Sequence, residues 1–90
     1  MSILVNIPTI MRVLTENKKT VESRGKNITE VVNSIEEDYP GIKSRIMKDG
    51  EVQKYVNIYL NDGDIRFTGG LSTEVSSGDV LTILPAVAGG

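Results

Sequence analysis

Apolar residues near the start of the chain recur with a period of two. Ile3, Val5 and Ile7 follow this alternation, which is typical of a strand with one buried face. A polar turn over residues 15–18 separates this strand from a returning strand predicted over 19–23. The two segments therefore predict an N-terminal hairpin.

The period changes to helical spacing from Asn27 onward. Asn27 and Glu30 resemble a capping box, in which a polar side chain caps the helix and an acidic one follows three residues later. Pro40 and Gly41 mark the end of the helix. One apolar stripe is formed by Ile28, Val31, Val32, Ile35 and Tyr39. We therefore expect an amphipathic helix that buries this stripe.

Three acidic residues, Glu36, Glu37 and Asp38, occupy the last turn of that helix. A helix C-terminus carries partial negative charge, so each anion there is disfavoured by roughly 0.3–1 kcal/mol. We interpret the cluster as a solvated face. A contact surface for a basic partner is the alternative.

The second half of the chain predicts shorter elements. A helical turn is expected over residues 42–47, followed by a polar connection at 48–51. Strands are predicted over 55–60, 64–67 and 80–84. The order of two strands, one helix and further strands predicts an α+β fold, with the main helix packed across one face of a mixed sheet.

The amino-acid composition excludes several classes of function but does not by itself indicate one. The 90 residues are 39% hydrophobic and 24% charged, which is typical of one small globular domain. The chain has no cysteine and no histidine, so thiol nucleophiles, zinc–cysteine sites and the commonest general base are excluded. The net charge of −2 favours neither nucleic acid nor membrane surfaces as partners. Because the chain has no apparent signal peptide and no cysteines to form disulfides, we expect a cytoplasmic protein. Because it also lacks these catalytic side chains, we do not expect it to be an enzyme on its own.

The last six residues, Pro85-Ala86-Val87-Ala88-Gly89-Gly90, are small, uncharged and end in two glycines. We expect residues 1–84 to form one domain and residues 85–90 a flexible tail, because Pro85 has no N–H to continue a ladder. Six extended residues reach roughly 20 Å, and the glycines could enter a slot too narrow for other residues. The candidate reactive group is the carboxylate of Gly90; a frayed terminus is the alternative.

The alternation of side chains along each strand also predicts which apolar residues face away from the core. In the strand over 55–60, Tyr59 should face outward, and in the strand over 80–84 so should Leu84. Together with Phe67 they are our candidates for a partner-docking surface, since exposed apolar patches often mark interfaces. A monomer with a few scattered apolar residues on its surface is the alternative.

These features together resemble a ubiquitin-like β-grasp protein, and specifically the MoaD/ThiS family of sulfur carriers. The resemblance extends over essentially the whole chain and is sharpest in residues 7–10, 56–67 and 81–90. Those stretches are most similar to the CysO-like carriers of cysteine biosynthesis. The chain is longer around residues 41–54 than typical thiamine-branch carriers, which disfavours that branch.

The resemblance implies a mechanism in which partner enzymes hold all the cofactors. An E1-like enzyme would adenylate Gly90 with ATP and magnesium, and sulfur would displace AMP to leave a thiocarboxylate. A cysteine synthase with pyridoxal phosphate would supply the acceptor, and a zinc metalloprotease would release the cysteine. In this scheme Gly89 and Gly90 thread the partners' active sites, while Val87 and Ala88 fill the approach. This chain would bind no cofactor or metal itself.

Three other functions stay open at this point. The chain could be the small subunit of a molybdopterin synthase, where a thiocarboxylate on a Gly-Gly tail is also used. It could be a protein modifier, whose Gly90 forms isopeptide bonds with target lysines. It could also be a plain structural domain, for which removal of Gly89 and Gly90 would change nothing downstream.

Overall fold

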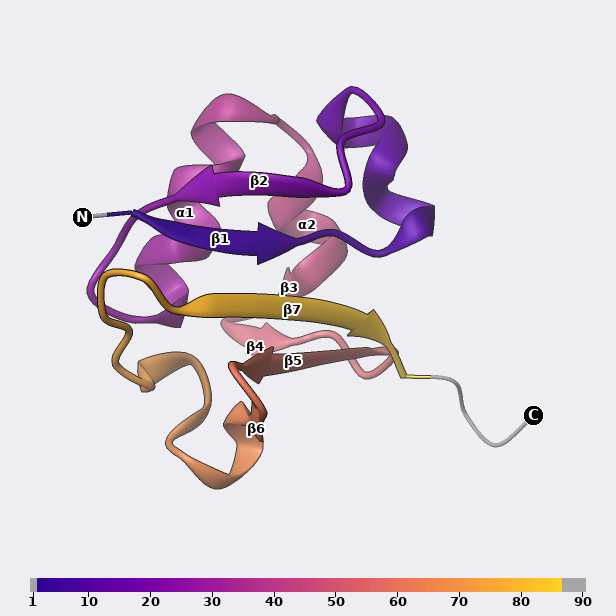
Figure 1. Ribbon diagram of the computed structural model, residues 1–90. Helices are drawn as coiled ribbons and strands as arrows, with labels where there is room; N and C mark the ends of the chain where they lie inside the picture. Colours follow the sequence, from indigo (N-terminus) through magenta and orange to yellow (C-terminus); the bar gives the residue numbers. More distant parts are fainter. Residues whose placement is uncertain (1, 87–90) are drawn as a thin grey trace.

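The computed structural model describes residues 2–86 and contains one mixed sheet, a small second sheet and two α-helices (Figure 1). The strands within this part of the chain are β1 (Ile3–Asn6), β2 (Thr20–Ser23), β3 (Met47–Lys48), β4 (Glu51–Val52), β5 (Val56–Leu60), β6 (Gly63–Asp64) and β7 (Val80–Pro85). The helices are α1 (Ile28–Asp38) and α2 (Ile42–Ile46), with 3-10 turns η1 (Thr9–Thr15), η2 (Ile65–Phe67) and η3 (Gly70–Ser72).

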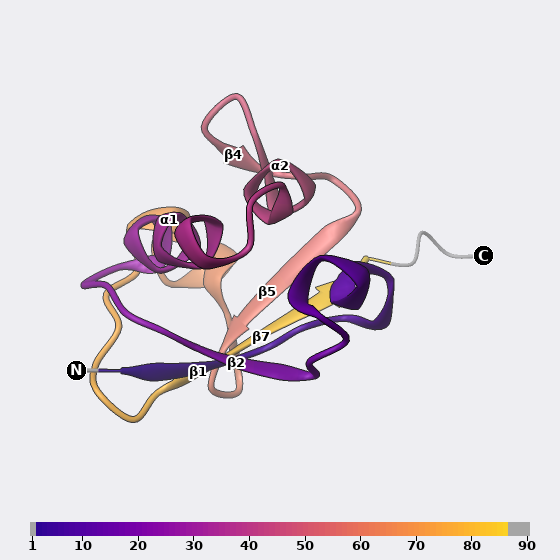
Figure 2. The ribbon, with the colours of Figure 1, turned by 90° about the horizontal axis from the view of Figure 1, so that it is seen from above.

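The large sheet has the strand order β2-β1-β7-β5-β6. Its central pair, β1 and β7, is parallel, and the other neighbouring pairs are antiparallel. Figure 2 shows α1 and α2 on one side of this sheet, so its other face is left without a helix. The predicted N-terminal hairpin, the mixed sheet and the helix across one face are therefore confirmed.

The core lies between α1, α2 and the inner face of the sheet. Alternate residues of β1, β5 and β7 supply the sheet side, as the period of two predicted. The helical stripe supplies the other side, and Tyr39 packs at its edge. The largest fully buried side chains include Ile28, Ile35, Ile42, Ile46, Ile58, Leu81 and Ile83. Sheet and helices thus form two layers around one core.

The first helix begins where the sequence predicts it. The Asn27 side chain accepts a hydrogen bond from the N–H of Glu30 (2.9 Å). The Glu30 carboxylate accepts from the N–H of Lys26 (2.9 Å), one residue before the position that a standard capping box uses. Before them, Gly25 allows a close approach, since a Cβ there would lie 2.7 Å from the Val31 nitrogen.

The acidic cluster at the end of α1 is divided in its roles. The Glu36 carboxylate accepts hydrogen bonds from the backbone N–H groups of Gly41 and Lys43, at 3.0 and 2.8 Å. These bonds, that from Gly41 first, lower the pKa of Glu36 below its ordinary value of 4.5. Glu37 and Asp38 are exposed. The solvated face that we expected therefore describes two of the three residues, while Glu36 holds the corner between α1 and α2.

Three segments differ from the sequence-based expectation. The strand predicted over 64–67 is wrong beyond Asp64, because the Asp64 side chain accepts from the Arg66 N–H (2.9 Å) and closes a 3-10 turn. The polar connection predicted at 48–51 is a hairpin between β3 and β4, with positive φ at Asp49 and Gly50. The 3-10 turn η1, between β1 and β2, was not predicted.

The last strand also runs further than Pro85 led us to expect. Pro85 lies opposite Val56, and the next residue, Ala86, donates its N–H to the Tyr55 carbonyl (2.7 Å). Hydrogen-bonded and non-hydrogen-bonded pairs alternate in antiparallel strands, so the pair of Val56 and Pro85 is one that exchanges no bonds. The missing N–H of proline costs the ladder nothing here.

Candidate functional site

The residues predicted to react or to enter partner enzymes, Val87, Ala88, Gly89 and Gly90, lie outside the described residues. What the structure describes is the base from which they continue. Strand β7 is held between β1 and β5, and its pairing with β5 extends to Ala86. The last described residues are therefore fixed to the rigid sheet. We call the surface around Leu84, Pro85 and Ala86 the root of the tail.

Leu84 and Tyr59 both lie on the outer face of the sheet, on adjacent strands. Leu84 is opposite Asn57, and Tyr59 is opposite Thr82, so the two candidates are diagonal neighbours two positions apart. Leu84 is 43% exposed, whereas Tyr59 is half-buried. The structure brings these two docking candidates onto one face, with Leu84 as the more accessible.

Between the apolar positions the outer face is polar. The Asn6 amide donates to the Thr82 hydroxyl (3.2 Å) and accepts from the Thr20 hydroxyl (3.0 Å). This chain of hydrogen bonds crosses β2, β1 and β7 on the side away from the helices. It satisfies the polar groups of a face that the fold leaves in solvent.

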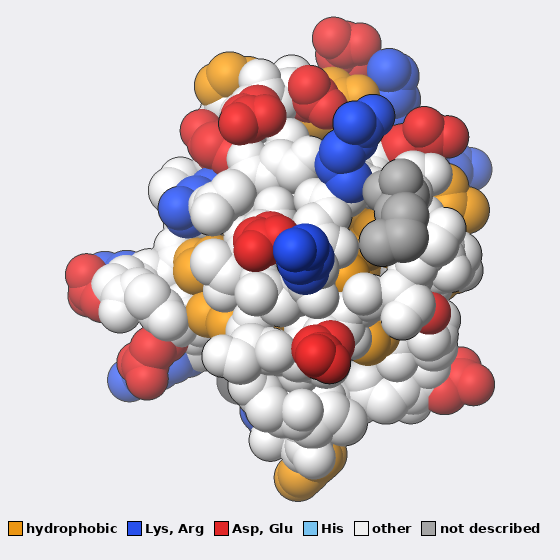
Figure 3. Space-filling view, turned by 90° about the vertical axis from the view of Figure 1, so that its left-hand side faces the viewer, with side chains coloured by type: hydrophobic (Ala, Val, Ile, Leu, Met, Phe, Trp, Pro, Cys, Tyr) orange, Lys and Arg blue, Asp and Glu red, His pale blue; other side chains and the backbone are white. Residues whose placement is uncertain are grey.

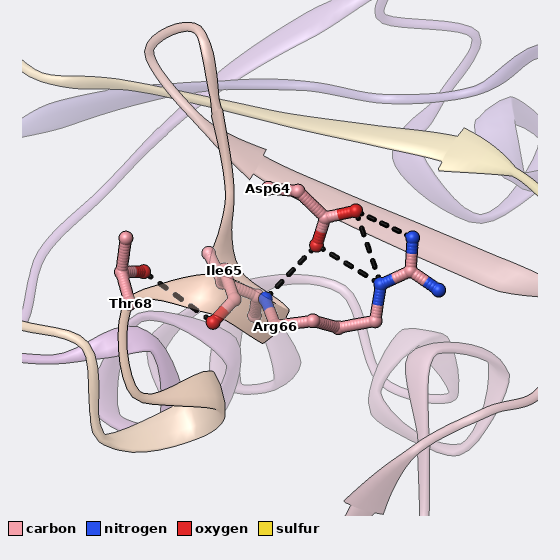
Figure 4. Close-up of polar contacts among 4 residues, drawn as sticks. All are labelled: Asp64, Ile65, Arg66 and Thr68. Atoms are coloured by element: carbon pink, nitrogen blue, oxygen red, sulfur yellow. Dashed lines mark hydrogen bonds and ion pairs between the residues drawn. The ribbon is translucent and has the colours of Figure 1, made fainter.

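Phe67, the third docking candidate, lies apart from the sheet strands, in η2. It is 84% exposed, and the Arg66 guanidinium lies 5.9 Å from its ring centroid. Figure 4 shows Arg66 in turn held by Asp64, with Nη2 of Arg66 2.6 Å from a carboxylate oxygen of Asp64. The hydrogen bonds from Arg66 lower the pKa of the Asp64 carboxyl. The Thr68 hydroxyl donates to the Ile65 carbonyl and completes this turn (3.3 Å). The structure therefore presents Phe67 on its own rigid turn.

Among the exposed apolar residues that sequence reasoning did not name as docking candidates, Ile10 and Val13 are the most exposed. They belong to η1, which Figures 1 and 2 place at the same end of the molecule as the last residues of β7. Ile10 is 61% and Val13 75% exposed, while Met11 between them is buried. The signal was present in the run of residues 10–14, which has more apolar positions than one turn can bury.

The geometry of the described residues is that of a docking surface, with no group of residues arranged for metal chemistry. Across residues 2–86 there is no cluster of three or more acidic, histidine or cysteine side chains able to hold a metal ion. In the same part of the chain, no helix is long and apolar enough to cross a lipid bilayer. The outer face and the root of the tail offer contact area for a protein partner.

Comparison with known proteins gives this arrangement a family. The model of the ThiS family matches residues 5–90, which is nearly the whole chain. The chain belongs to the ThiS family. This confirms the resemblance on which the sequence-based interpretation rests.

Two known proteins resemble the chain over almost all of its length. The sulfur carrier protein CysO of Mycobacterium tuberculosis is 46% identical over 93 residues, covering 100% of both chains. A chain in the crystal structure of the Amycolatopsis orientalis BexX/CysO complex is 48% identical, covers 98% of this chain and 99% of its own length, and has a TM-score of 0.93. This structural match confirms the ubiquitin-like β-grasp fold of this ThiS family member.

A protein modifier is also among the relatives. The small archaeal modifier protein 3 of Haloferax volcanii is 35% identical over 63 residues, which is 70% of this chain and 68% of that protein. Members of the ThiS family and proteins that resemble them are thus named both as sulfur carriers and as modifiers.

Proposed function

We propose that this chain is a sulfur carrier that bears sulfur as a thiocarboxylate on Gly90 and delivers it for cysteine biosynthesis. The observation that carries the proposal is the 46% identity to a CysO sulfur carrier over its full length. The structure supports it by ending its described part in a strand fixed to the sheet up to Ala86, beside an outer face left in solvent.

The need for an activating enzyme follows from the low reactivity of the Gly90 carboxylate. A carboxylate is a poor electrophile, so an E1-like enzyme would first join the Gly90 carboxylate to the AMP part of ATP, with magnesium, and release pyrophosphate. Sulfide, or a persulfide followed by a thiol that reduces the resulting acyl disulfide, would then displace AMP and leave sulfur in place of one carboxylate oxygen. Every side chain that this activation needs would belong to the partner, as expected for a chain without cysteine or histidine.

The later partners are part of the same proposal. The thiocarboxylate sulfur would bond to an acceptor in a cysteine synthase that holds pyridoxal phosphate, which would leave the new cysteine joined to Gly90 as a thioester. The acyl group would then shift to the cysteine nitrogen, and a zinc metalloprotease would hydrolyse this amide bond to free cysteine and the Gly90 carboxylate. Gly89 and Gly90 would enter these active sites because they have no Cβ, with Ala88 and Val87 behind them. Leu84 and Tyr59 would contact the partner body, and Phe67 would contribute a separate apolar contact.

A second candidate function is protein modification, favoured by the 35% identity to small archaeal modifier protein 3. In that case the activated Gly90 carbonyl would be captured by a lysine amine of a target, with AMP or a thiol as the leaving group. The two candidates share activation and differ in the atom that ends up bonded to Gly90.

Mass spectrometry of the C-terminal peptide distinguishes the two functions. The intact protein is incubated with ATP, a sulfur source and the host's activating enzyme, and the product is treated with a thiol-directed alkylating agent. We expect sulfur at Gly90. Exchange of oxygen for sulfur has nearly the same mass as oxidation of a methionine, so the alkylated fragment must be localised to Gly90.

The matched control is the chain without Gly90. We expect this variant to fold as the wild type does and to gain no sulfur, since the root of the tail is already fixed to the sheet at Ala86. A large fall in its melting temperature would contradict a tail that is separate from the domain. Lysine adducts on other proteins, with an unmodified Gly90 in the free pool, would favour the modifier function instead.

A further inference from the structure

A hollow on the outer face of the sheet lies directly beside the root of the tail. It has a volume of about 330 Å³, and its walls come from η1, the start of β2 and the end of β7. Ile10, Leu84 and Pro85 contribute exposed aliphatic surface to it. Arg12 and Lys19 are its charged residues, and none of the described residues that line it is acidic. We call this feature the basic-rimmed hollow.

The two cations are positioned differently, and both are available to a partner. Arg12 is half-buried and donates from Nε to the Ile7 carbonyl (3.0 Å), which fixes the start of its guanidinium group. Lys19 is exposed. Within residues 2–86 neither forms an ion pair. Lys18, by contrast, is already engaged: it lies 3.7 Å from a Glu16 carboxylate oxygen and donates to the Tyr39 hydroxyl (3.2 Å).

The charge of this hollow is opposite in sign to that of the chain as a whole. The chain as a whole has a net charge of −2. Figure 3 shows the opposite end of the sheet, where acidic and basic side chains lie close together and acidic ones gather along the upper edge. A single-sign surface within an acidic protein gives direction to the approach of an oppositely charged partner.

From this hollow we infer a contact surface that extends beyond the Leu84 and Tyr59 contacts proposed above: the basic-rimmed hollow docks an acidic face of the enzyme that activates Gly90, with an apolar side chain of that enzyme seated between Ile10 and Leu84. A small anion would pair with the cations but leave the aliphatic side chains in water. An apolar ligand alone would leave the cations without a partner. A protein face with acidic residues around an apolar centre matches both.

The activating enzyme is inferred as the partner from two things: the proposed function, on which this inference rests, and the position of the hollow. Any enzyme that holds Gly90 must lie within reach of the tail, and six extended residues span roughly 20 Å at most. The hollow adjoins the first of those residues, Pro85. An enzyme with Gly90 in its active site would therefore cover this end of the sheet before any other surface.

Charge reversal at the two ends of one strand tests the inference. Lys19 precedes β2 and Arg24 follows it, so Lys19→Glu and Arg24→Glu change the net charge equally at opposite ends of the sheet. We expect Lys19→Glu to weaken binding of the activating enzyme by about threefold to tenfold, and Arg12→Glu/Lys19→Glu by about tenfold to hundredfold. Arg24→Glu should change it by less than about twofold.

The dependence on salt gives a second readout. Because exposed charges are screened, raising NaCl from about 0.05 to about 0.5 M should weaken binding of the wild type. The double variant should lose most of this dependence. Since Arg12 also holds the Ile7 carbonyl, melting temperatures are measured for each variant, and the single Lys19→Glu variant, whose side chain is exposed, does not depend on that bond.

The kinetics of sulfur transfer to Gly90 separate this inference from the proposed function. We expect the double variant to have a raised KM for the carrier and a kcat within about twofold of wild type, because Gly90 is intact. Sulfur at Gly90 with the same KM in wild type and double variant would overturn the docking surface alone. No sulfur at Gly90 in the wild type would overturn the carrier role and, with it, the occupant inferred for the hollow.

Discussion

The inner and outer faces of the sheet are built from the same strands but serve different purposes. Two leucines of β7 illustrate this: Leu81 faces the helices and is 0% exposed, while Leu84 faces away and is 43% exposed. The inner face is almost entirely aliphatic, and the outer face combines Leu84 with the hydrogen-bonded Asn6 and Thr82. One face is occupied within the chain itself, and the other is left for something outside it.

The comparison predicts that one mutation, made at two positions of the same strand, will have different effects. Leu81→Ala removes buried methyl groups from a packed site and should lower the free energy of unfolding by about 2–5 kcal/mol. Leu84→Ala removes surface that water already reaches and should lower it by about 0.5 kcal/mol or less. Chemical denaturation of both variants measures this; equal losses would contradict a division of roles between the faces.

For partner binding, in contrast to stability, we expect mutations on the outer face to have the larger effect. Leu84→Glu places a charge at the root of the tail and should weaken binding of the activating enzyme by about tenfold or more, with little change in melting temperature. Titration calorimetry with the activating enzyme measures the affinity. Phe67→Glu, on the separate turn η2, is compared with it and should weaken binding less, because Phe67 lies apart from the root of the tail. Unchanged affinity for Leu84→Glu would remove Leu84 from the interface.

Most of the inner face could be predicted from the sequence because its signals are local. The alternation of Ile3, Val5 and Ile7 and the spacing of the α1 stripe each lie within one element, and Asn27 marks the helix start by its own side chain. Burial on one side of such an element is dictated by its period, whatever packs against it. The order of these elements along the chain predicted the mixed sheet with the main helix packed across one face.

The outer face and the connections depended on interactions that a period does not reveal. Ile65 and Phe67 alternate as in a strand, yet the Asp64 carboxylate draws the Arg66 N–H into a turn. The Asp49–Gly50 pair is a typical hairpin signal and could have predicted β3 and β4. The basic-rimmed hollow could not have been found in this way, because Arg12 and Lys19 come together with Leu84 only through the pairing of β1 with β7.

The helix α1, which packs on the inner face of the sheet, should depend on its N-terminal cap for stability. Asn27→Ala removes the acceptor for the Glu30 N–H and should lower the free energy of unfolding by about 0.5–2 kcal/mol. Asn33→Ala, at an exposed position inside the same helix, is the control. Alanine favours a helix interior, so this control should be neutral or slightly stabilising by thermal denaturation. A loss at Asn33 equal to that at Asn27 would mean that α1 is not held by its cap.

The hydrogen bonds of Glu36 at the corner between α1 and α2 should make the stability of the protein sensitive to acid. The pKa of Glu36 is lowered by the N–H groups of Gly41 and Lys43, so its contribution to stability is present above its ordinary pKa of 4.5 and is lost as the pH falls through the lower folded value. Glu36→Gln should therefore be less stable than wild type at neutral pH, and the difference should shrink as the pH falls below about 4. Melting temperatures measured across this range test the sign. Glu37→Gln, next to it on the exposed side, removes the same charge without these bonds, so a matching pH dependence in that variant would assign the effect to net charge and not to the corner.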